Sequence, residues 1–413
     1  MIRSYEKYKR IDGYEYIEFL PQDWDLLPNK AIFEERVSRG HINEELLSVT
    51  IGKGIIKQTQ VANKKDNSNE DKSSYKLSKI GDIVYNKMRM WQGSVGHSPY
   101  RGIVSPAYVV LKPKSNIYSR YYHYLFRSKY YSNYSKRFSY GLCDDQLNLR
   151  YSDFKNMYSI VPPIETQISI ANYLDLKSQQ LDKYKVSMEY AKKLLLEKIN
   201  STVFGIDKKT VADKDLDWQE LFNDEWKFVK ASRIFTEINI KNKINEKLLS
   251  VTQDRGVIFK DDAKENFVSP TEYKNLKLVE KENFVISLRS FQGGIELSEI
   301  RGIVSPAYNV FKFNKGFYDT GLLIYYKYLF KTPQFITLLN TIIVGIRDGK
   351  NISYKDFSTL YLPIPDELTM KKITRLDEIF NRFKKDLNEE IERMDEYLES
   401  LTFNVVTGKI KID

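Results

Sequence analysis

The sequence predicts an α+β fold in which two duplicated, mixed α/β domains are separated by a long antiparallel two-helix coiled coil with approximate two-fold symmetry. Three observations predict this fold: an internal repeat with an offset of about 200 residues, short strand-like segments in each copy, and a long helix with a regular apolar spacing after each copy.

The repeat is the clearest of the three observations. Four pairs of segments carry it: RGIVSPAY (101–108 and 301–308), INEELLSVT (42–50) with INEKLLSVT (244–252), RMWQG (89–93) with RSFQG (289–293), and YSDF (151–154) with YKDF (354–357). The offset between the members of a pair stays between 200 and 203. One duplicated unit with small loop insertions explains this regularity.

The first part of each copy is predicted to be a mixed α/β domain. GDIVYNKM (81–88) and RGIVSPAYVVLKP (101–113) are short apolar runs bounded by Gly, Pro and Asn, which is typical of strands. One helix is expected after the SPAY segment of each copy, near 119–137 and 320–342.

The second part of each copy is predicted to be a long helix. The helices begin after the Pro-rich turns VPPIET (161–166) and LPIPDE (362–367), with Thr166 and Asp366 as candidate N-caps. Apolar residues repeat every three or four positions along both helices, at Leu181, Tyr184, Met188, Ala191 and Leu195, and at Leu376, Phe380, Phe383, Leu387, Ile391, Met394, Leu398, Leu401 and Val405. Two matching seams in one chain favour an antiparallel coiled coil over helices that each pack only on their own domain.

These features predict four consecutive parts of the chain. They are a first domain with an N-terminal linker (1–160), a first spacer helix (161–205), a linker with the second domain (206–363), and a second spacer helix with a tail (364–413).

Composition limits the class of protein. The chain has 413 residues, of which 42% are hydrophobic and 29% charged, as in globular proteins. No stretch approaches the ~18 consecutive apolar residues of a membrane span, and MIRSYEKYKR lacks an apolar signal core. A single cysteine, Cys143, excludes an intramolecular disulfide framework, and three scattered histidines, His41, His97 and His123, exclude a zinc cluster. We therefore expect a cytosolic protein.

The positive charge is concentrated in one region. Residues 72–155 hold 15 Lys and Arg against 4 Asp and Glu, a net charge of +11, whereas the whole chain carries +10. This imbalance predicts a polyanionic partner. The same region holds 13 of the 30 tyrosines. Rings interleaved with cations could stack on bases, but we expect most of these tyrosines to pack in a helix–core interface.

No catalytic motif is present. The chain has no GxxxxGK[ST] segment and no GxGxxG after a strand, and the double proline in VPPI lacks the polar and aromatic neighbours of a methyltransferase loop. A nuclease-like arrangement can be assembled only from Asp262, Glu272 and Lys274. We therefore predict a binding protein that has no catalytic residues and no metal ligands of its own.

The duplication separates two kinds of candidate DNA contact. Polar residues kept in both copies should serve the scaffold or phosphate contacts, whereas differing residues should discriminate between bases. The kept residues are Arg89, Gln92 and Arg101, matched by Arg289, Gln292 and Arg301. The differing cations are Lys87 (Ser287 in the second copy), Lys136 and Arg137 in one loop region, and Arg347 and Lys350 in the other. For Arg101 and Arg301, a buried salt bridge that holds the SPAY strand is an equal alternative.

These motifs resemble one known family, the specificity (S) subunits of Type I restriction–modification enzymes. The resemblance rests on the LLSVT block, the GDIVYNKMRMWQG run, RGIVSPAY, the Y-x-DF…P turn and the long helix, which occur twice and cover nearly the whole chain. It implies that the domains are target-recognition domains, each reading one half of an asymmetric bipartite DNA sequence, and that the helices set the gap between the halves.

The resemblance also implies the partners. These are double-stranded DNA, two methyltransferase subunits that dock along the helices and use S-adenosylmethionine, and two ATP-dependent motor–nuclease subunits. S-adenosylmethionine, ATP and Mg would belong to the partner subunits, and this chain would hold no cofactor.

Two other functions are open at this stage. The chain could be the specificity subunit of a two-chain restriction enzyme with a fused methyltransferase–nuclease partner, or a stand-alone tandem DNA-binding regulator. If the long helices expose an apolar stripe on which a partner could dock, the stand-alone regulator is disfavoured. The candidate residues of this stripe are Ile168, Ile170, Leu176, Leu194, Ile373 and Ile379.

Overall fold

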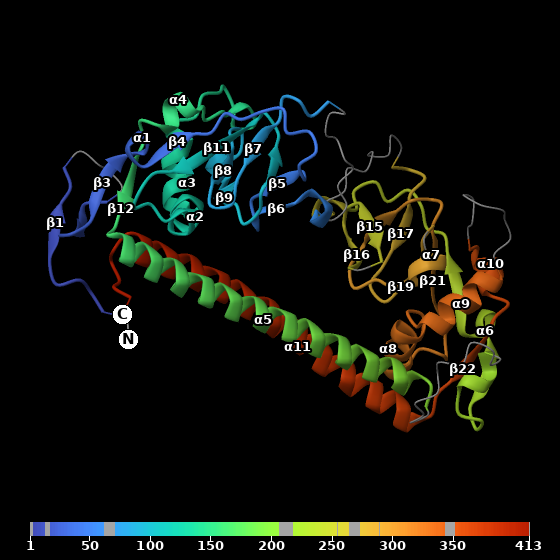
Figure 1. The fold of residues 1–413 in the computed structure, drawn as a ribbon. Coiled ribbons are helices and arrows are strands. Elements are labelled where there is room, and N and C mark those ends of the chain that lie inside the picture. Colours follow the sequence, from blue (N-terminus) through green and yellow to red (C-terminus); the bar gives the residue numbers. More distant parts are fainter. Residues whose placement is uncertain are drawn as a thin grey trace. The chain divides into compact units, whose positions relative to one another are not determined.

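The computed structural model describes residues 3–12, 17–61, 71–205, 218–253, 255–263, 273–288, 290–342 and 352–412. The chain forms two compact units (Figure 1). The first unit comprises Met1–Val186 with Glu389–Asp413, and the second comprises Ser187–Asn388. Both long helices are divided at this boundary, so each unit contains one end of each helix.

The first unit contains twelve described strands and a set of helices. The strands are β1 (Tyr8–Arg10), β2 (Phe19–Pro21), β3 (Asp25–Pro28), β4 (Phe33–Glu35), β5 (Leu47–Thr50), β6 (Gly54–Lys57), β7 (Lys76–Ser78), β8 (Ile83–Asn86), β9 (Val95–His97), β10 (Gly102–Val104), β11 (Tyr108–Pro113) and β12 (Tyr158–Val161). The helices, in which η marks a short 3-10 helix, are α1 (Asn29–Ile32), η1 (Gln58–Gln60), η2 (Met90–Gln92), α2 (Ser119–Arg127), α3 (Lys129–Arg137), η3 (Asp144–Gln146), α4 (Tyr151–Phe154) and the start of α5 (Ile164–Val203).

The second unit repeats this series of elements. Its described strands are β13 (Lys227–Lys230), β14 (Phe235–Ile238), β15 (Leu249–Thr252), β16 (Gly256–Phe259), β17 (Lys277–Val279), β18 (Phe284–Ile286), β19 (Glu296–Leu297), β20 (Gly302–Val304), β21 (Asn309–Phe313) and β22 (Tyr361–Ile364). Its helices are η4 (Trp218–Leu221), α6 (Ala231–Ile234), η5 (Lys260–Asp262), α7 (Ser290–Gly293), α8 (Thr320–Leu329), α9 (Pro333–Thr341), α10 (Tyr354–Phe357) and the start of α11 (Glu367–Val406).

The two units have the same sheet topology. Each has a four-stranded antiparallel sheet, in the order β4-β11-β8-β9 in the first unit and β14-β21-β18-β19 in the second. Smaller antiparallel pairs also correspond: β5 with β6 and β15 with β16, β7 with β10 and β17 with β20, and β3 with β12 and β13 with β22. The predicted duplicated α+β fold is therefore confirmed.

The helix after the SPAY segment differs from the prediction. Single helices over 119–137 and 320–342 are wrong, because both units break this segment into two short helices. Ser128 and Thr332 have extended backbones, with ψ of 145° and 143°, and their side chains accept the backbone N–H three residues later. Pro333 directly follows the break in the second unit and favours the start of a new helix there. The sequence did not predict these breaks, because aromatic and apolar residues continue on both sides of Ser128 and Thr332.

The tyrosines of α2 and α3 belong to the core of the first unit, as predicted. The buried ones are Tyr121, Tyr122, Tyr124, Tyr130, Tyr131 and Tyr134. Their rings pack on one another and on neighbouring phenylalanines; for example, the ring centroids of Phe126 and Tyr131 are 4.5 Å apart. These rings are therefore not available for stacking on bases.

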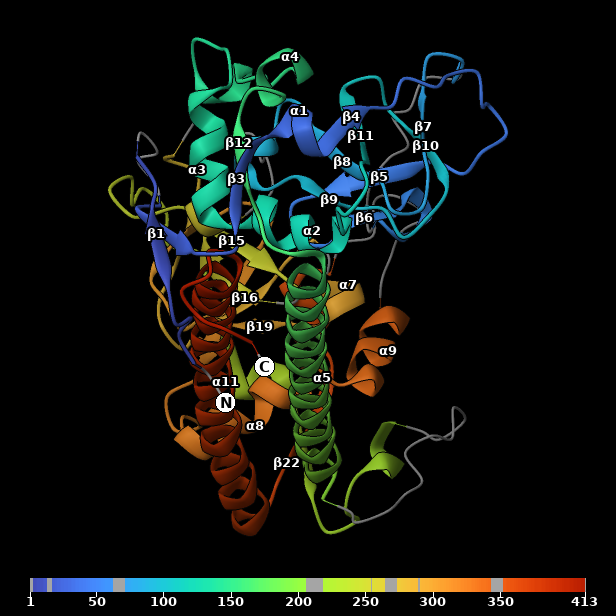
Figure 2. The same cartoon turned by 60° about the vertical axis from the view of Figure 1, so that its left-hand side comes forward.

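The helix ends in the first unit run side by side and antiparallel (Figures 1 and 2). Near the start of α5, Leu174 shares a hydrophobic core with Val405 near the end of α11. Further along α5, Lys185 Nζ lies 2.6 Å from Asp395 Oδ1, which is earlier in α11. In the second unit, Val203 at the end of α5 shares a core with Ile373 at the start of α11.

The predicted apolar seam residues of α5 and α11 are turned away from solvent. Every seam residue of α11 is buried or half-buried, and the five predicted seam residues of α5 are half-buried. Ile170 and Ile373, which were candidates for a docking stripe, are fully buried, so they belong to the internal cores instead. The other four candidates, Ile168, Leu176, Leu194 and Ile379, are exposed. Among the described helices, none combines the length and apolar composition that a membrane span requires.

The starts of the two long helices differ from each other. Asp366 precedes α11, and its Oδ1 accepts the backbone N–H of Thr369 at 2.7 Å, so the predicted N-cap is confirmed. Thr166 lies inside the first turn of α5, which begins at Ile164. The prediction of a Thr166 cap is therefore wrong, because the preceding prolines allow the helix to start earlier.

A tyrosine–aspartate hydrogen bond joins the α/β part of each unit to a long helix. Tyr124 of α2 donates to Asp175 Oδ1 of α5 at 2.5 Å, and Tyr328 of α8 donates to Asp377 Oδ1 of α11 at 2.7 Å. Because the same contact occurs twice, it belongs to the framework that both copies need.

Candidate nucleic-acid interface

A tight turn between β8 and β9 exposes two of the predicted contact residues. The backbone N–H of Arg89 donates to Asn86 O at 3.1 Å, and η2 follows directly. Met90 is fully buried and anchors the turn, whereas Arg89 and Gln92 are exposed. We call residues 87–93 the Arg89 turn. A guanidinium and a carboxamide held outward on an anchored turn can donate to phosphate oxygens or to base edges.

Helix α3 packs against this turn and brings in two further cations. Lys136 Nζ lies 4.7 Å from the centroid of the Trp91 ring and 2.9 Å from Asp144 Oδ1. Arg137 is the last residue of the same helix. Lys136 is therefore both exposed and held in place by an aromatic ring and a carboxylate.

Lys87 has a structural role as well as a charge. Its backbone N–H donates to Ala107 O at 3.3 Å, and its carbonyl accepts the N–H of Leu149 at 2.8 Å. Burial lowers the pKa of its ammonium group, with a smaller contribution from Lys76. The first unit thus brings together five predicted residues: Lys87, Arg89, Gln92, Lys136 and Arg137.

Arg101 is not part of this group. The Arg89 turn precedes β9 and Arg101 follows it, so the two arginines lie beyond opposite ends of a three-residue strand. Arg101 Nε lies 2.7 Å from Glu44 Oε1, in a loop that precedes β5. In the second unit, Arg301 makes the same contact with Glu246 at 2.8 Å, and a further one with Glu280 at 3.0 Å.

The salt-bridge interpretation of these two arginines is therefore supported, although the bridges are not buried. Both arginine side chains are 49% exposed. The duplicated pairing indicates that Arg101 and Arg301 hold the loop before β5 or β15 against the strand that follows them.

Only part of the corresponding site in the second unit is described. Gln292 is exposed on α7, and its Oε1 accepts from Gln253 Nε2 at 3.3 Å. Arg289, Arg347 and Lys350 lie outside the described residues.

Arg127 is a supporting residue that the sequence did not reveal. Its guanidinium donates to five backbone carbonyls, at 3.4 Å to Thr50, 2.6 Å to Ile51, 2.8 Å to Gly52, 3.5 Å to Gly93 and 3.2 Å to Val95. Burial, and then repulsion from a neighbouring arginine, lower the pKa of this group. Arg127 therefore joins the β5–β6 turn to β9, next to the Arg89 turn.

The second unit replaces this arrangement with an ion pair. Lys331 contacts the carboxylate of Glu296 and the carbonyl of Gln253. Glu296 stands where the first unit has Gly96. The signal for this pair was the match of YYHYLFRS (121–128) with YYKYLFKT (325–332).

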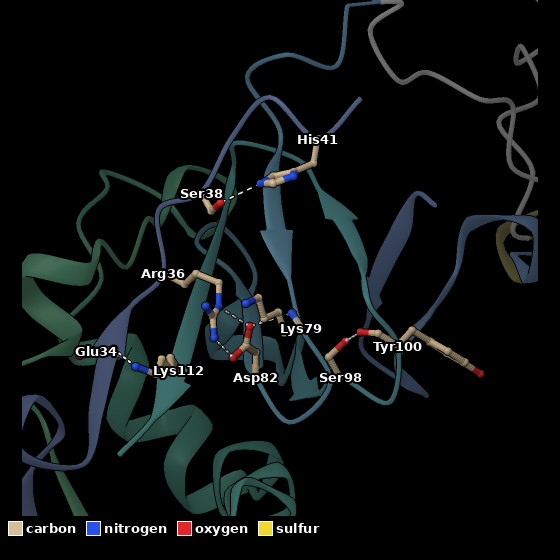
Figure 3. A network of polar contacts seen from close by, with 9 residues as sticks. All are labelled: Glu34, Arg36, Ser38, His41, Lys79, Asp82, Ser98, Tyr100 and Lys112. Atoms are coloured by element: carbon tan, nitrogen blue, oxygen red, sulfur yellow. Dashed lines mark hydrogen bonds and ion pairs between the residues drawn. The ribbon is translucent and has the colours of Figure 1, made fainter. Parts of the chain in front are cut away.

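A polar network supports the other end of β8 (Figure 3). Arg36 makes two contacts with Asp82, 2.7 Å from Nε to Oδ2 and 3.0 Å from Nη2 to Oδ1. Asp82 Oδ2 also accepts the backbone N–H of Lys79 at 2.8 Å. On the neighbouring strand pair, Lys112 Nζ lies 2.6 Å from Glu34 Oε1. The contacts of Asp82 fix the turn before β8, and thus the strand that leads to the Arg89 turn.

The nuclease alternative gains no support from the described residues. Asp262 lies in η5, where its carbonyl accepts from Arg255 Nη1 at 3.1 Å, and Glu272 lies outside the described residues. Within the described ranges, no three His, Cys, Asp or Glu side chains gather as metal ligands do.

Comparisons with known proteins agree with the duplicated architecture. No protein-family model matches the sequence. A Methanocaldococcus jannaschii protein that carries the name of the MjaX type I restriction enzyme specificity subunit is 23% identical over 425 aligned positions, which cover 95% of each chain.

A solved structure agrees in fold. A chain from a structure that concerns complex assembly and conformational transition of a type I restriction–modification system superposes with a TM-score of 0.61 at 13% identity. The match covers 94% of this chain and 99% of that one. In sequence, therefore, the chain is similar to a protein named as a type I restriction enzyme specificity subunit, which is the family that its duplicated motifs resemble, and in fold it is similar to a chain of a type I restriction–modification system.

Proposed function

We propose that this chain reads DNA sequence for a type I restriction–modification enzyme, with each unit reading one half of an asymmetric, bipartite target. The observation that carries the proposal is one sheet topology built twice with different side chains on corresponding turns. Lys87 is half-buried at the start of the Arg89 turn. Its predicted match with Ser287 is wrong: Val84 pairs with Val110 and Val285 pairs with the equivalent Val310, so the counterpart of Lys87 is Leu288, which is exposed and uncharged. One framework with two different surfaces suits two different half-sites.

The predicted site residues fall into two groups, those that we assign to DNA contact and those that hold a loop. In the first unit, we assign DNA contacts to Lys87, Arg89, Gln92, Lys136 and Arg137, and in the second to Arg289, Gln292, Arg347 and Lys350. Cations on the turn and on α3 would neutralise phosphates, and Arg or Gln side chains could also reach base edges in the major groove. We assign Arg101 and Arg301 to holding a loop, because each joins the strand that follows it to a glutamate in the loop before β5 or β15. Lys136 is also paired, but with Asp144 next to the Arg89 turn.

The long helices are the proposed docking surface for methyltransferase subunits. Ile168 and Leu176 are exposed on α5 in the first unit, and Leu194 on α5 and Ile379 on α11 are exposed in the second. Isobutyl and sec-butyl groups left in water would gain free energy if a partner subunit covered them. The partners would supply methylation with S-adenosylmethionine and ATP-driven restriction with Mg, so this chain itself would be non-catalytic.

A domain exchange tests the proposal. Residues 225–363 would be replaced with the corresponding segment of a relative, and adenine methylation would be mapped at base resolution in cells that express the chimera and its partner subunits. We expect one half of the recognised sequence to change while the other half and the gap stay the same. Cells without the gene serve as the control. A change in both halves would refute the modular assignment.

A further inference from the structure

The chain between α3 and α4 presents apolar side chains to solvent beside the cationic group of the first unit. We call residues 138–148 the Leu142 loop. Leu142 is 99% exposed and Tyr140 is 78% exposed, and Phe138 is also exposed. Single exposed apolar residues are common. Three within five positions, next to cations, make this loop unusual among the described surfaces of the first unit.

The loop has a defined shape. Tyr140 and Asn148 form an isolated antiparallel bridge, with N···O distances of 3.1 and 2.8 Å. Helix η3 forms part of the chain between them. A Cβ atom on Gly141 would lie 2.6 Å from the carbonyl carbon of Gln146, so the close backbone approach requires glycine at this position. The bridge therefore closes a compact loop with Leu142 near its tip.

Two contacts attach the Leu142 loop to the Arg89 turn. Lys136 lies between Trp91 of the turn and Asp144 of the loop, 4.7 Å from the ring centroid and 2.9 Å from the carboxylate. Directly after the loop, the N–H of Leu149 donates to Lys87 O at 2.8 Å. The chain between α3 and α4 lies on the side of the first unit away from the first turns of α5 (Figure 2). The apolar tip and the cations thus form one connected surface.

We propose that Leu142 is a wedge that inserts between two stacked base pairs of the first half-site. This inference rests on the proposed function, and it adds a specificity-determining residue to it. Cations of the Arg89 turn and α3 would draw the phosphates close, and the Leu142 side chain would leave water as it enters between the bases. Unstacking a base step costs free energy, which apolar contact with the exposed base faces offsets.

A wedge would select sequence without hydrogen bonds to bases. Pyrimidine–purine steps such as TA and CA unstack more easily than other steps. The wedge therefore predicts that the first half-site contains such a step, at a fixed position opposite Leu142. Replacing it with a stiffer step should weaken binding even where no base edge is contacted.

The test uses the full chain with its methyltransferase subunits and a duplex that carries the methylation-mapped target. 2-Aminopurine, whose fluorescence rises when it is unstacked, replaces one adenine at a time through the first half-site. We expect a fluorescence increase of several-fold at one step. Leu142→Ala should abolish this increase and weaken binding about tenfold, because most of the buried side chain is lost. Leu142→Met, which keeps a long apolar side chain, should retain both properties.

Ile80→Ala is the matched control. Ile80 is also an exposed aliphatic residue (70%), but it lies in the turn before β8, at the opposite end of that strand from the Arg89 turn. We expect no effect of this change on fluorescence or on affinity.

The outcomes separate the wedge from the function on which it rests. Specific binding by the wild-type complex without any unstacked step, and unchanged by Leu142→Ala, would overturn the wedge and leave the proposed function intact. Loss of a co-purifying subunit in Leu142→Ala, with unchanged fluorescence, would overturn it in favour of a protein contact. Absence of specific binding by the wild-type complex would overturn both proposals.

Discussion

Arg36 and Asp82 form a two-point ion pair in the first unit, and the corresponding positions in the second unit hold Ile238 and Asn283. The Asp82 side chain is 2% exposed. In both units the aspartate or asparagine accepts the backbone N–H three residues earlier, at 2.8 and 2.9 Å. The turn before the central strand is therefore built in the same way twice, once with a charge pair and once without.

This difference between the two units predicts strong energetic coupling between the side chains of Arg36 and Asp82. Asp82→Asn leaves the largely buried guanidinium of Arg36 without its counter-charge, and should lower the free energy of unfolding of the first unit by about 3 kcal/mol. The double change Arg36→Ile with Asp82→Asn, which reproduces the second unit, should restore stability to within about 1 kcal/mol of the wild type. Urea unfolding of the wild type, Arg36→Ile, Asp82→Asn and the double variant measures the coupling. Additive single effects would contradict it.

Two half-buried histidines, His97 and His123, predict a pH dependence that belongs to the first unit. Burial, and then Arg120, lower the pKa of His97 to about 4 and lower the pKa of His123 as well. The backbone N–H of His97 donates to His123 Nδ1 at 3.3 Å, which requires a neutral His123 ring. The second unit has Leu297 and Lys327 at these positions.

The sign of the effect follows from proton binding. Unfolded histidines titrate near pH 6.5, so between about pH 6.5 and 4 the unfolded chain binds more protons than the folded one. Stability of the first unit should therefore be complete above this window and fall as the pH drops through it. Scanning calorimetry of the full chain between pH 7.5 and 5 measures the midpoint, and His97→Leu should reduce its decline. An equal decline in the variant would rule out His97 as a source.

Arg89 should contribute a phosphate contact. Arg89→Gln should weaken DNA binding across sequences, and should reduce the slope of log Kd against log salt concentration by about 1, because one fewer counterion is released. Arg101→Gln is the matched control, since Arg101 is paired with Glu44. We expect it to leave the slope unchanged. Titrations of the complex at several salt concentrations measure both slopes, and equal slopes for wild type and Arg89→Gln would exclude the contact.

The long helices should set the gap between the half-sites. Helices α5 and α11 each run for 40 residues. Insertion of seven residues into each, which keeps the apolar seam in register, adds ~10 Å of helix. At ~3.4 Å per base pair, the gap in the methylated sequence should widen by about three base pairs. Methylation mapping reports the gap, and an unchanged gap would contradict the role of the helices as spacers. Insertion in only one helix is the control, because it breaks the register of the seam.

The sequence could predict which residues are candidates for the site, but not which of them lie close together. The repeat singled out Arg89, Gln92 and Arg101 together because all three are kept in both copies. In the structure, Arg101 lies apart from the other two and pairs with Glu44. This pairing could not be read from the sequence, because Glu44 lies 57 positions earlier in the chain. Arg127 escaped notice because its role depends on backbone carbonyls of other elements, which leave no pattern in the sequence.

The order of the elements, the duplication and the apolar faces of the long helices followed from the sequence alone. Repeats and periodic spacing are properties of neighbouring residues, and each unit must bury the same faces to fold. Only the tertiary structure decided that Ile170 and Ile373 are buried while Ile168 and Ile379 are exposed, and which cations are held in ion pairs. Burial and charge pairing depend on residues far apart in the chain, whose approach is set by packing of the whole unit rather than by local preference.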